Sequence, residues 1–209
     1  TVHGLDIIYG RRAGFLPSIY RGFMFLVRKT AFVYSEYIGH SANTCALAED
    51  AGLSPTRVVP LAVDSKNIAT PNENMQLPEN FVFFFGRVVK RKGLGWFLKE
   101  VLPLLPKEVV VVAAGTIWEE EELLGSDATR FQHLGVVTQE DLSRCCRDAI
   151  CVVMPNISCE EDGDVEGFGL VAVEAAAMGA VVLAASTDGL VDAIKSGETG
   201  FLLTSEEAS

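Results

Sequence analysis

From Phe81 onward, short uninterrupted apolar runs alternate with longer segments of mixed polarity. The apolar runs predict buried strands at residues 81–85 and 109–114, and we predict further strands at 131–134, 150–154, 180–185 and 201–203. The segments between them predict helices at 93–105, 118–124 and 139–147, in the alanine-rich stretch up to Met178, and at 190–195. Apolar strands that alternate with helices are typical of a parallel sheet covered on both faces. We therefore predict an α/β fold, in which ligands bind beyond the carboxyl ends of the strands.

The residues before Phe81 are organised less regularly. We expect a strand end at 1–3, a turn at 4–6, a strand at 31–35, a helix at 40–51 capped by Ser41 and ended by Gly52, and a strand at 57–63. Residues 65–80 are polar and proline-containing, which is typical of a linker. The sequence thus predicts a first domain at 1–64, a linker at 65–80 and a second domain at 81–209.

Residues 16–29 form an apolar segment with basic edges, and two interpretations of it stay open. A surface helix of this kind can touch anionic lipid through its arginines and aromatic side chains. A crossover helix that packs on its own sheet would show the same pattern, and the sequence favours that interpretation. If the first interpretation holds, residues 11–29 give the protein a peripheral contact with a membrane surface.

Charge and composition narrow the classes of function. The net charge of −11 argues against nucleic acid as a partner, although residues 1–30 carry five cations against a single acid. No apolar run approaches the roughly 18 residues that span a bilayer. The five cysteines form no C-x-x-C pair, so we expect reduced, structural thiols in a cytoplasmic protein. The three histidines lack the spacing of metal ligands, and we expect no metal.

The stretch from Glu166 to Met178 carries the sharpest chemical signal. An acidic loop with two glycines runs into a helix, and Glu174 follows Glu166 by eight positions. Backbone N–H groups at a helix start lack internal partners and suit a phosphate. Gly167 and Gly169 would let a ligand approach the backbone. The arrangement predicts a diphosphate cradle with a hydroxyl-binding carboxylate on either side, although two ordinary surface glutamates would give the same spacing.

A second signal follows the strand at 81–85. Gly86 and Arg87 lead into Lys90, Arg91 and Lys92, which places four cations within six residues of an acidic chain. A basic cluster at the carboxyl end of a strand suits a diphosphate. A solvated charged turn is the alternative, and the cluster alone does not distinguish the two.

Several segments, in order along the chain, resemble the retaining glycosyltransferases of family 4. These segments are Val2-His3-Gly4-Leu5-Asp6, Pro60-Leu61-Ala62-Val63-Asp64, Gly86-Arg87 with Arg91-Lys92-Gly93, Glu166 to Glu174 with its E-G-F-G-L form, and Gly197-Glu198-Thr199-Gly200-Phe201-Leu202. The resemblance implies the GT-B architecture of two Rossmann-like domains. It also implies that the chain is a piece of a longer protein, with a remnant of the acceptor-side domain at 1–64 and the donor-binding domain at 81–209.

The resemblance further implies a role for each matched residue. Arg87 and Lys92 would bind the donor diphosphate, Glu166 and His3 the donor sugar, and Glu174 the ribose hydroxyls. The remaining donor contacts would come from Gly86, Phe168, Gly169, Leu170 and Val171, with Gly135 and Val136 beside the base. The sequence departs from the family at Thr187-Asp188-Gly189, where a glycine pair is common, and at Asp192, where glutamate is common.

The reaction implied is transfer of a sugar from a nucleotide-diphosphate donor to an acceptor, with retention at the anomeric carbon. No metal or other cofactor would be required, because cationic side chains and a helix end supply the positive charge. A sugar-nucleotide epimerase or a glycan phosphorylase on the same scaffold stays open, as does a non-catalytic binding or scaffolding module. The acceptor is unknown, with a lipid or a glycan as the candidates, and we expect this chain alone to turn over little or no donor.

Overall fold

The computed structural model describes residues 3, 7–30, 33–34, 36–64, 69–125, 127–159 and 164–204. Backbone contacts divide the chain into two compact units. The first unit comprises Thr1–Leu61, Ser158–Gly169 and Thr187–Ala193, and the second comprises Ala62–Ile157, Leu170–Ser186 and Ile194–Ser209. The division into domains at 1–64 and 81–209 stays a prediction.

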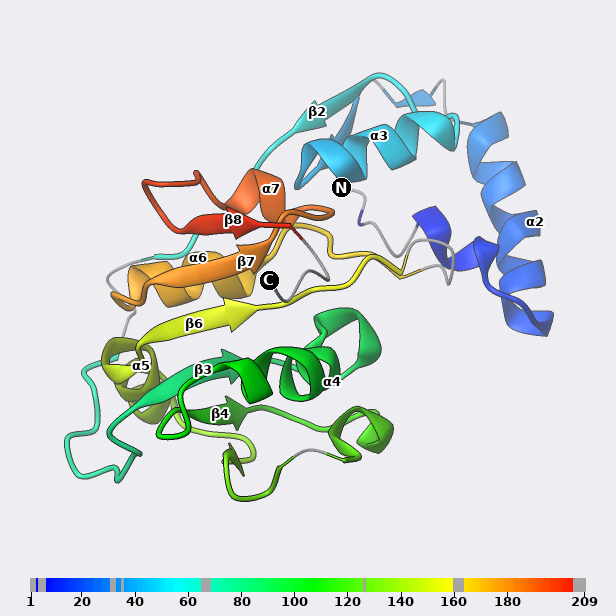
Figure 1. Ribbon diagram of the computed structural model, residues 1–209. Coiled ribbons are helices and arrows are strands. Elements are labelled where there is room, and N and C mark those ends of the chain that lie inside the picture. The colour runs from blue at the N-terminus through cyan, green and yellow to red at the C-terminus, as the bar shows by residue number, and fades with distance from the viewer. Residues whose placement is uncertain are drawn as a thin grey trace. The chain divides into compact units, whose positions relative to one another are not determined.

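The second unit is built on a six-stranded, all-parallel sheet (Figure 1), which confirms the predicted fold class. The strands lie in the order β5-β4-β3-β6-β7-β8. Their bounds are Phe81–Phe85 for β3, Val110–Ala114 for β4, Phe131–His133 for β5, Cys151–Met154 for β6, Val182–Ala185 for β7 and Phe201–Leu203 for β8. All five residues of β3 are buried, because both faces of a central parallel strand are covered.

The helices of this unit match the predicted segments, with shorter or less regular turns. They are η4 Lys90–Lys92, α4 Leu94–Trp96, the π-helical turn η5 Phe97–Val101, η6 Leu102–Leu104, η7 Glu120–Leu123, α5 Gln139–Asp148 and α6 Leu170–Ala177. The predicted helix at 93–105 is therefore three joined helical turns, and Pro103 lies at the start of the last one. Leu94, Leu98 and Leu102 from these turns pack on Val111 and Val153 of the sheet in one buried cluster.

The first unit contains η1 Tyr9–Arg11, α2 Phe15–Lys29, β1 Tyr37–Gly39, α3 Ala42–Asp50, β2 Thr56–Val58 and α7 Leu190–Ala193. Ser41 caps α3 by accepting a hydrogen bond from the Thr44 amide, as predicted. The strand predicted at 31–35 is wrong for Val33 and Tyr34, and its place is taken by β1. Residues 31, 32 and 35, and the predicted strand end and turn at 1–6 apart from His3, lie outside the described residues.

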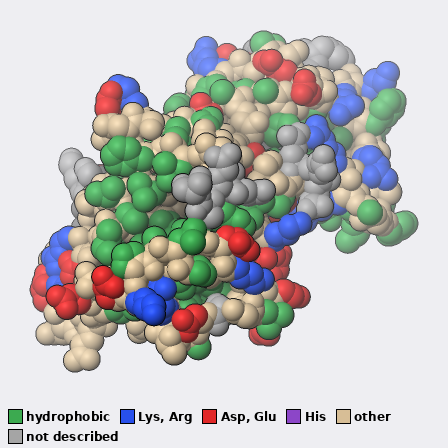
Figure 2. Space-filling view, in the orientation of Figure 1, with side chains coloured by type: hydrophobic (Ala, Val, Ile, Leu, Met, Phe, Trp, Pro, Cys, Tyr) green, Lys and Arg blue, Asp and Glu red, His purple; other side chains and the backbone are tan. Residues whose placement is uncertain are grey.

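Helix α2 has one packed face and one exposed face. Met24 and Val27 pack against the buried side chains of Tyr37, Ala48 and Leu53, as a crossover helix would. Six other large apolar side chains of the helix are exposed, namely Phe15, Leu16, Ile19, Phe23, Phe25 and Leu26. Hydrophobic side chains and Lys or Arg side chains are interspersed over this surface in Figure 2. The crossover-helix interpretation, which the sequence favoured, therefore accounts only for the face of α2 that carries Met24 and Val27.

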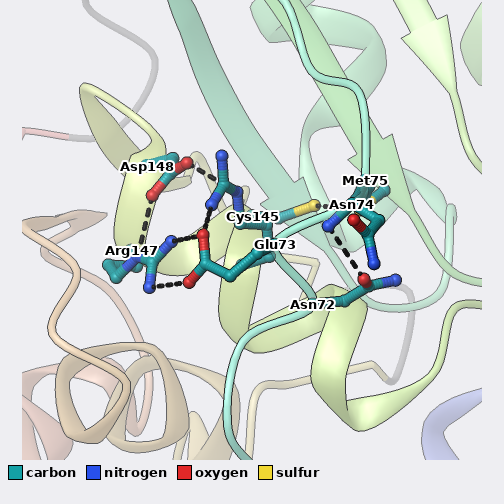
Figure 3. A network of polar contacts seen from close by, with 8 residues as sticks. Asn72, Glu73, Asn74, Met75, Cys145, Arg147 and Asp148 are labelled. Carbon is teal, nitrogen blue, oxygen red and sulfur yellow. Dashed lines mark hydrogen bonds and ion pairs between the residues drawn. The ribbon is translucent and has the colours of Figure 1, made fainter.

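In the second unit, the predicted linker is fastened to α5 by a network of charged groups (Figure 3). Arg147 donates to both carboxylate oxygens of Glu73, at 2.8 and 3.2 Å, and the guanidinium of Arg144 also pairs with Glu73. Asp148 forms ion pairs with the Nε atoms of Arg144 and Arg147, at 2.7 and 2.9 Å. Asn72 adds a hydrogen bond of 2.8 Å to Asp141. These contacts fix residues 72–75 against α5.

This network predicts an acid-sensitive contribution to stability. The hydrogen bond from Arg147 is the main cause that lowers the pKa of Glu73 below its ordinary value of 4.5. A depressed pKa in the folded chain means that the stabilisation is present above the unfolded pKa and is lost as pH falls through the folded pKa. We expect the difference in unfolding free energy between the wild-type chain and Glu73→Gln, measured by urea denaturation, to shrink toward zero as pH falls below about 4.5.

Glu79→Gln is the matched control, because Glu79 lies in the same segment and makes no ion pair among the described residues. Its difference from the wild-type chain should show no such trend over the same pH range. A difference between the wild-type chain and Glu73→Gln that stays constant from pH 7 to pH 3 would contradict the assignment.

Candidate functional site

The strand order of the second unit locates a candidate site. From β3 the chain builds outward through β4 and β5, and from β6 it builds in the opposite direction through β7 and β8. The reversal point therefore lies between β3 and β6, which pair through Val82 with Cys151 and Phe83 with Val152. Ligands of open α/β sheets bind beyond the carboxyl ends of the strands at such a point.

Three glycines stand at the carboxyl ends of neighbouring strands. Gly86 follows β3, Gly115 follows β4 and Gly135 lies just after β5, and all three have positive φ, at 134°, 131° and 70°. A Cβ on Gly115 would lie 2.0 Å from the Gly86 carbonyl oxygen, so only glycine fits there. A Cβ on Gly86 or Gly135 would meet no heavy atom within 4 Å. The backbone at these two predicted donor-binding residues therefore faces open space, which suits the close approach of a ligand.

The cationic turn, residues 86–93, is packed into the reversal point. Arg87 is exposed, whereas Arg91 and Lys92 are only 6% and 7% exposed. The Ile157 amide donates to the Arg91 carbonyl oxygen at 2.9 Å, which ties the turn to the segment after β6. A solvated charged turn, the alternative that the sequence left open, does not describe these two buried cations. Burying a charge is costly unless it is compensated, and both of these cations interact with other groups of the chain.

The cationic turn is also paired with the segment that follows β4. The Val88 amide donates to the Thr116 carbonyl oxygen at 2.9 Å, and the Trp118 amide donates to the Val88 carbonyl oxygen at 3.1 Å. The Lys90 amide donates to Glu119 Oε2 at 2.6 Å. The guanidinium carbon of Arg87 lies 4.6 Å from the centroid of the Trp118 ring. This stacking was not predicted, because the sequence placed Trp118 in an acidic helix, whereas η7 begins at Glu120.

Glu174 lies in α6, whose first residue is Leu170. This helix connects the parallel strands β6 and β7, so its N-terminal end, with Leu170 and Val171, lies toward the carboxyl edge of the sheet. The Glu174 side chain is half-buried, and burial raises the pKa of its carboxyl group. Its charge contributes to the raised pKa of Cys146, about 12, although burial of that thiol is the larger cause. Among the described residues, the Glu174 side chain makes no hydrogen bond or ion pair.

Glu166 is held in a loop of the first unit. Its amide donates to Asp188 Oδ2 at 3.1 Å, and its carbonyl oxygen accepts from the Gly189 amide at 3.0 Å. Asp188 has a φ of 48°, which Asp tolerates better than most residues. The departure from the family pattern at Asp188 thus combines a left-handed backbone with a side-chain acceptor for Glu166.

The neighbouring glycines of this loop differ in surroundings. Thr44 Oγ1 donates to the Gly167 carbonyl oxygen at 3.1 Å, while a Cβ on Gly167 would meet nothing within 4 Å. Gly169 has a φ of 89°, and a Cβ there would lie 2.5 Å from Leu190 Cδ2. The close approach at Gly169 is therefore made by the α7 side chain of Leu190. That contact accounts for glycine at 169 without a ligand, so the expected ligand approach has structural support at Gly167 only.

The predicted site residues thus fall into two sets. Gly86, Arg87, Lys92, Gly135, Val136, Leu170, Val171 and Glu174 belong to the second unit. His3, Glu166, Phe168 and Gly169 belong to the first unit. In that unit, Phe168 is buried and the ring of His3 lies 4.9 Å from the ring of His40. The departure at Asp192 also lies here, where its Oδ2 accepts from the Ala42 amide at the start of α3, at 2.8 Å.

Comparison with known proteins identifies the family. Residues 79–209, which are more than half of the chain, match the family described as Glycosyl transferases group 1. The chain belongs to the group 1 glycosyltransferases. The matched residues include the cationic turn, the E-x7-E segment and all six strands of the large sheet.

Curated relatives of this glycosyltransferase chain carry the same kind of name. It is 32% identical over 195 residues to a D-inositol 3-phosphate glycosyltransferase of Paenarthrobacter aurescens, covering 80% of this chain and 45% of that protein. It is 46% identical over 78 residues to the protein of that name from Streptomyces scabiei, covering 37% of this chain and 16% of that one. The chain therefore spans less than half of the length of these relatives.

Solved structures of similar fold include two further proteins. A sucrose-phosphate synthase from Thermosynechococcus elongatus matches with a TM-score of 0.73 and 22% identity, covering 100% of this chain and 55% of that one. Anabaena HepE, solved with UDP and glucose, matches with a TM-score of 0.71 and 21% identity, covering 88% of this chain and 54% of that one. At this identity the likeness concerns the fold alone.

Neither a membrane-spanning helix nor a metal-binding cluster is present among the described residues of this glycosyltransferase chain. None of the helices within the described ranges is long and apolar enough to cross a membrane. Within the same ranges, no three His, Cys, Asp or Glu side chains gather in a way that could hold a metal ion.

The packing at the reversal point makes a specific prediction for Gly93. This residue has a φ of 69°, and a Cβ on it would lie 1.8 Å from the Pro155 carbonyl oxygen. Gly93→Ala must therefore push apart the loops after β3 and β6. We expect it to lower the unfolding free energy, measured by urea denaturation, by at least about 3 kcal/mol.

Gly179→Ala is the matched control in the same unit. Gly179 has a φ of 90°, and a Cβ on it would meet nothing within 4 Å. Gly179→Ala should therefore lower the unfolding free energy only by the roughly 1–2 kcal/mol that a left-handed backbone costs an L-residue. Equal losses for the two variants would show that the contact between the two loops is not tight.

Proposed function

We propose that this chain carries the donor site of a glycosyltransferase that moves a sugar from a nucleotide-diphosphate donor to an acceptor, with retention at the anomeric carbon. One observation carries the proposal. Within a single unit, a cationic turn lies at the reversal point of the sheet, and Glu174 presents a half-buried carboxylate without a protein partner among the described residues. The cationic turn can bind a diphosphate, and the ribose hydroxyls can donate hydrogen bonds to the Glu174 carboxylate.

Each residue of the second unit has a part in this proposal. Arg87 and Lys92 bind the diphosphate, and the amides of Leu170 and Val171 at the start of α6 add donors to its oxygens. Glu174 accepts hydrogen bonds from the ribose hydroxyls. Val136, which is 81% exposed, offers an apolar surface to the base beside the open backbone of Gly135.

The residues of the first unit contact the sugar. We assign Glu166 to the sugar hydroxyls, with the backbone of Phe168 and Gly169 beside them and the ring of His3 as a further contact. The hydrogen bonds of the Glu166 main chain to Asp188 and Gly189 hold this loop in place. The same loop is anchored by Thr44, which is itself buried and bonded to Ser41 at 2.9 Å.

The chemistry follows from where negative charge grows. As the bond between the sugar and the diphosphate breaks, charge accumulates on the leaving phosphate. Cations fixed in advance stabilise that charge without reorganisation, and the buried Lys92 is fixed in this sense. Positive charge from Arg87, Lys92 and the α6 N-terminus can take the part that a divalent cation plays in other transferases. Attack by the acceptor on the face that the diphosphate leaves gives retention.

The named relatives suggest which donors to test first. HepE was solved with UDP and glucose, and also with UDP-glucose. The curated relatives are named as glycosyltransferases of D-inositol 3-phosphate. We therefore propose uridine diphosphate and UDP-glucose as the first ligands, with guanosine and adenosine diphosphates beside them.

The test is calorimetric titration of the 209-residue chain with these nucleotides. Loss of one hydrogen bond to a charged group costs roughly 1.5–3 kcal/mol. Arg87→Ala and Glu174→Ala should therefore each weaken nucleoside diphosphate binding about tenfold or more. Glu174→Ala should also weaken binding of the nucleoside alone, whereas Arg87→Ala should not, because only the former contacts the ribose.

Two exposed residues remote from the site serve as controls. Arg57 pairs with Glu36, and Glu198 pairs with Lys195, each at the surface. Arg57→Ala and Glu198→Ala should leave the isotherm unchanged. Unchanged isotherms for Arg87→Ala and Glu174→Ala as well would refute the site.

A second proposal concerns α2, because its exposed side chains fit an anionic lipid surface. Arg11, Arg21 and Arg28 line a cavity of about 610 Å³ in the first unit. Cations gathered in one hollow suit a phosphate head group. The exposed apolar side chains of the same helix can enter the acyl boundary beside the head group. We propose a peripheral contact through residues 11–29.

Binding to vesicles checks this second proposal. We expect the chain to sediment with vesicles of phosphatidylcholine and phosphatidylglycerol, and not with phosphatidylcholine alone. Arg28→Ala should weaken the binding about fivefold, since a basic residue near such a surface contributes about 1 kcal/mol. Arg57→Ala, an exposed arginine elsewhere in the unit, should have a clearly smaller effect. Equal sedimentation with neutral vesicles would show that the arginines do not drive the contact, and sedimentation with neither kind of vesicle would refute the proposal.

A further inference from the structure

We propose that Trp118 is a positioning residue for Arg87, holding its guanidinium ready for the donor diphosphate. The inference rests on the proposed donor site. Arg87 is the exposed arginine of the cationic turn, and among the described residues its side chain makes no hydrogen bond or ion pair. Its guanidinium carbon lies 4.6 Å from the centroid of the Trp118 ring. No carboxylate of the described chain neutralises it.

The position of Trp118 is fixed by the backbone. Val88 and Ile117 form an isolated parallel bridge beyond the ends of β3 and β4. The amides of Trp118 and Glu119 both donate to the Val88 carbonyl oxygen, at 3.1 and 3.2 Å. Both the amide and the carbonyl oxygen of Val88, the residue after Arg87, are therefore hydrogen-bonded to the segment that follows β4. This pairing places the Trp118 indole against the Arg87 guanidinium. The ring remains 63% exposed, so hydrophobic burial does not account for its place.

Stacking holds a cation in a way that an ion pair cannot. A guanidinium carries its five N–H donors in its own plane. A ring against its face restricts its rotation and leaves those donors available for phosphate oxygens. A carboxylate would occupy two of the donors and cancel the charge. Glu119 follows Trp118 in sequence, and its Oε2 accepts from the Lys90 amide at 2.6 Å. Trp118 therefore orders Arg87 without neutralising it.

The fluorescence of the Trp118 indole provides a direct measurement of this contact. The chain has two tryptophans, so Trp96→Phe leaves Trp118 as the single tryptophan, which can be excited selectively over the tyrosines. We expect uridine, guanosine or adenosine diphosphate to change the Trp118 emission saturably, and the matching nucleoside to leave it unchanged. The nucleoside lacks the phosphates that would draw Arg87 away from the ring or hold it there.

Variants of Trp118 separate positioning from a structural role. Trp118→Leu keeps an apolar side chain without an aromatic face, and Trp118→Phe keeps the face. Trp118→Leu should weaken nucleoside diphosphate binding about two- to fivefold, the range of an exposed cation–π contact. Trp118→Phe should restore most of the affinity. In the Arg87→Ala background, Trp118→Leu should have no further effect.

The outcomes distinguish this inference from the proposed function. If the wild-type chain binds none of the diphosphates, the donor site fails and the inference fails with it. If the wild-type chain binds and Trp118→Leu binds equally well, the inference alone is overturned. An equal loss from Trp118→Leu with and without Arg87 would show that Trp118 does not act through Arg87, and would also overturn it.

Discussion

The candidate site depends on one close approach, between Gly93 and the carbonyl oxygen of Pro155. A Cβ at residue 93 would lie 1.8 Å from that oxygen, so the loops after β3 and β6 touch through bare backbone. These two strands flank the reversal point of the sheet. Because the loops meet there, the cations of the first loop are held over the place where an α/β sheet receives its ligand. Glycine is thus required at residue 93 so that the two loops can pack together, and this packing positions the candidate site.

The chain holds the charged groups around this contact in fixed places. Lys92 is almost fully buried, and Arg87 lies against an aromatic ring. Glu174 sits half-buried with its pKa raised by that burial. Elsewhere the same chain pairs its charges fully, as in the network of Glu73, Arg147 and Asp148. Those paired charges fasten the linker, whereas the side chains of Arg87 and Glu174 make no ion pair among the described residues, as a binding site needs.

Much of this could be predicted from the sequence. The six predicted strands correspond to six parallel strands, and the signal is clearest for a central strand such as β3, because a strand buried on both faces has no polar positions. Ser41 as a helix cap also followed from sequence, since the chemistry of a cap is local. The strand predicted at 31–35 was wrong, because a short apolar run does not say which of its residues will find a partner. Trp118 was missed for a related reason: its role depends on the pairing of Val88 with Ile117, which is 29 residues away in sequence.

The sequence by itself determined the class of fold, the family and the residues able to carry the chemistry, since periodicity and motif order are properties of the chain alone. Tertiary structure decided which of those residues are buried and what each one touches. It buried Arg91 and Lys92, set Arg87 against Trp118, and gave Gly169 a side-chain neighbour where a ligand was expected. The physical reason is that burial, desolvation and stacking are set by segments distant in sequence, and these are known only once the chain is folded.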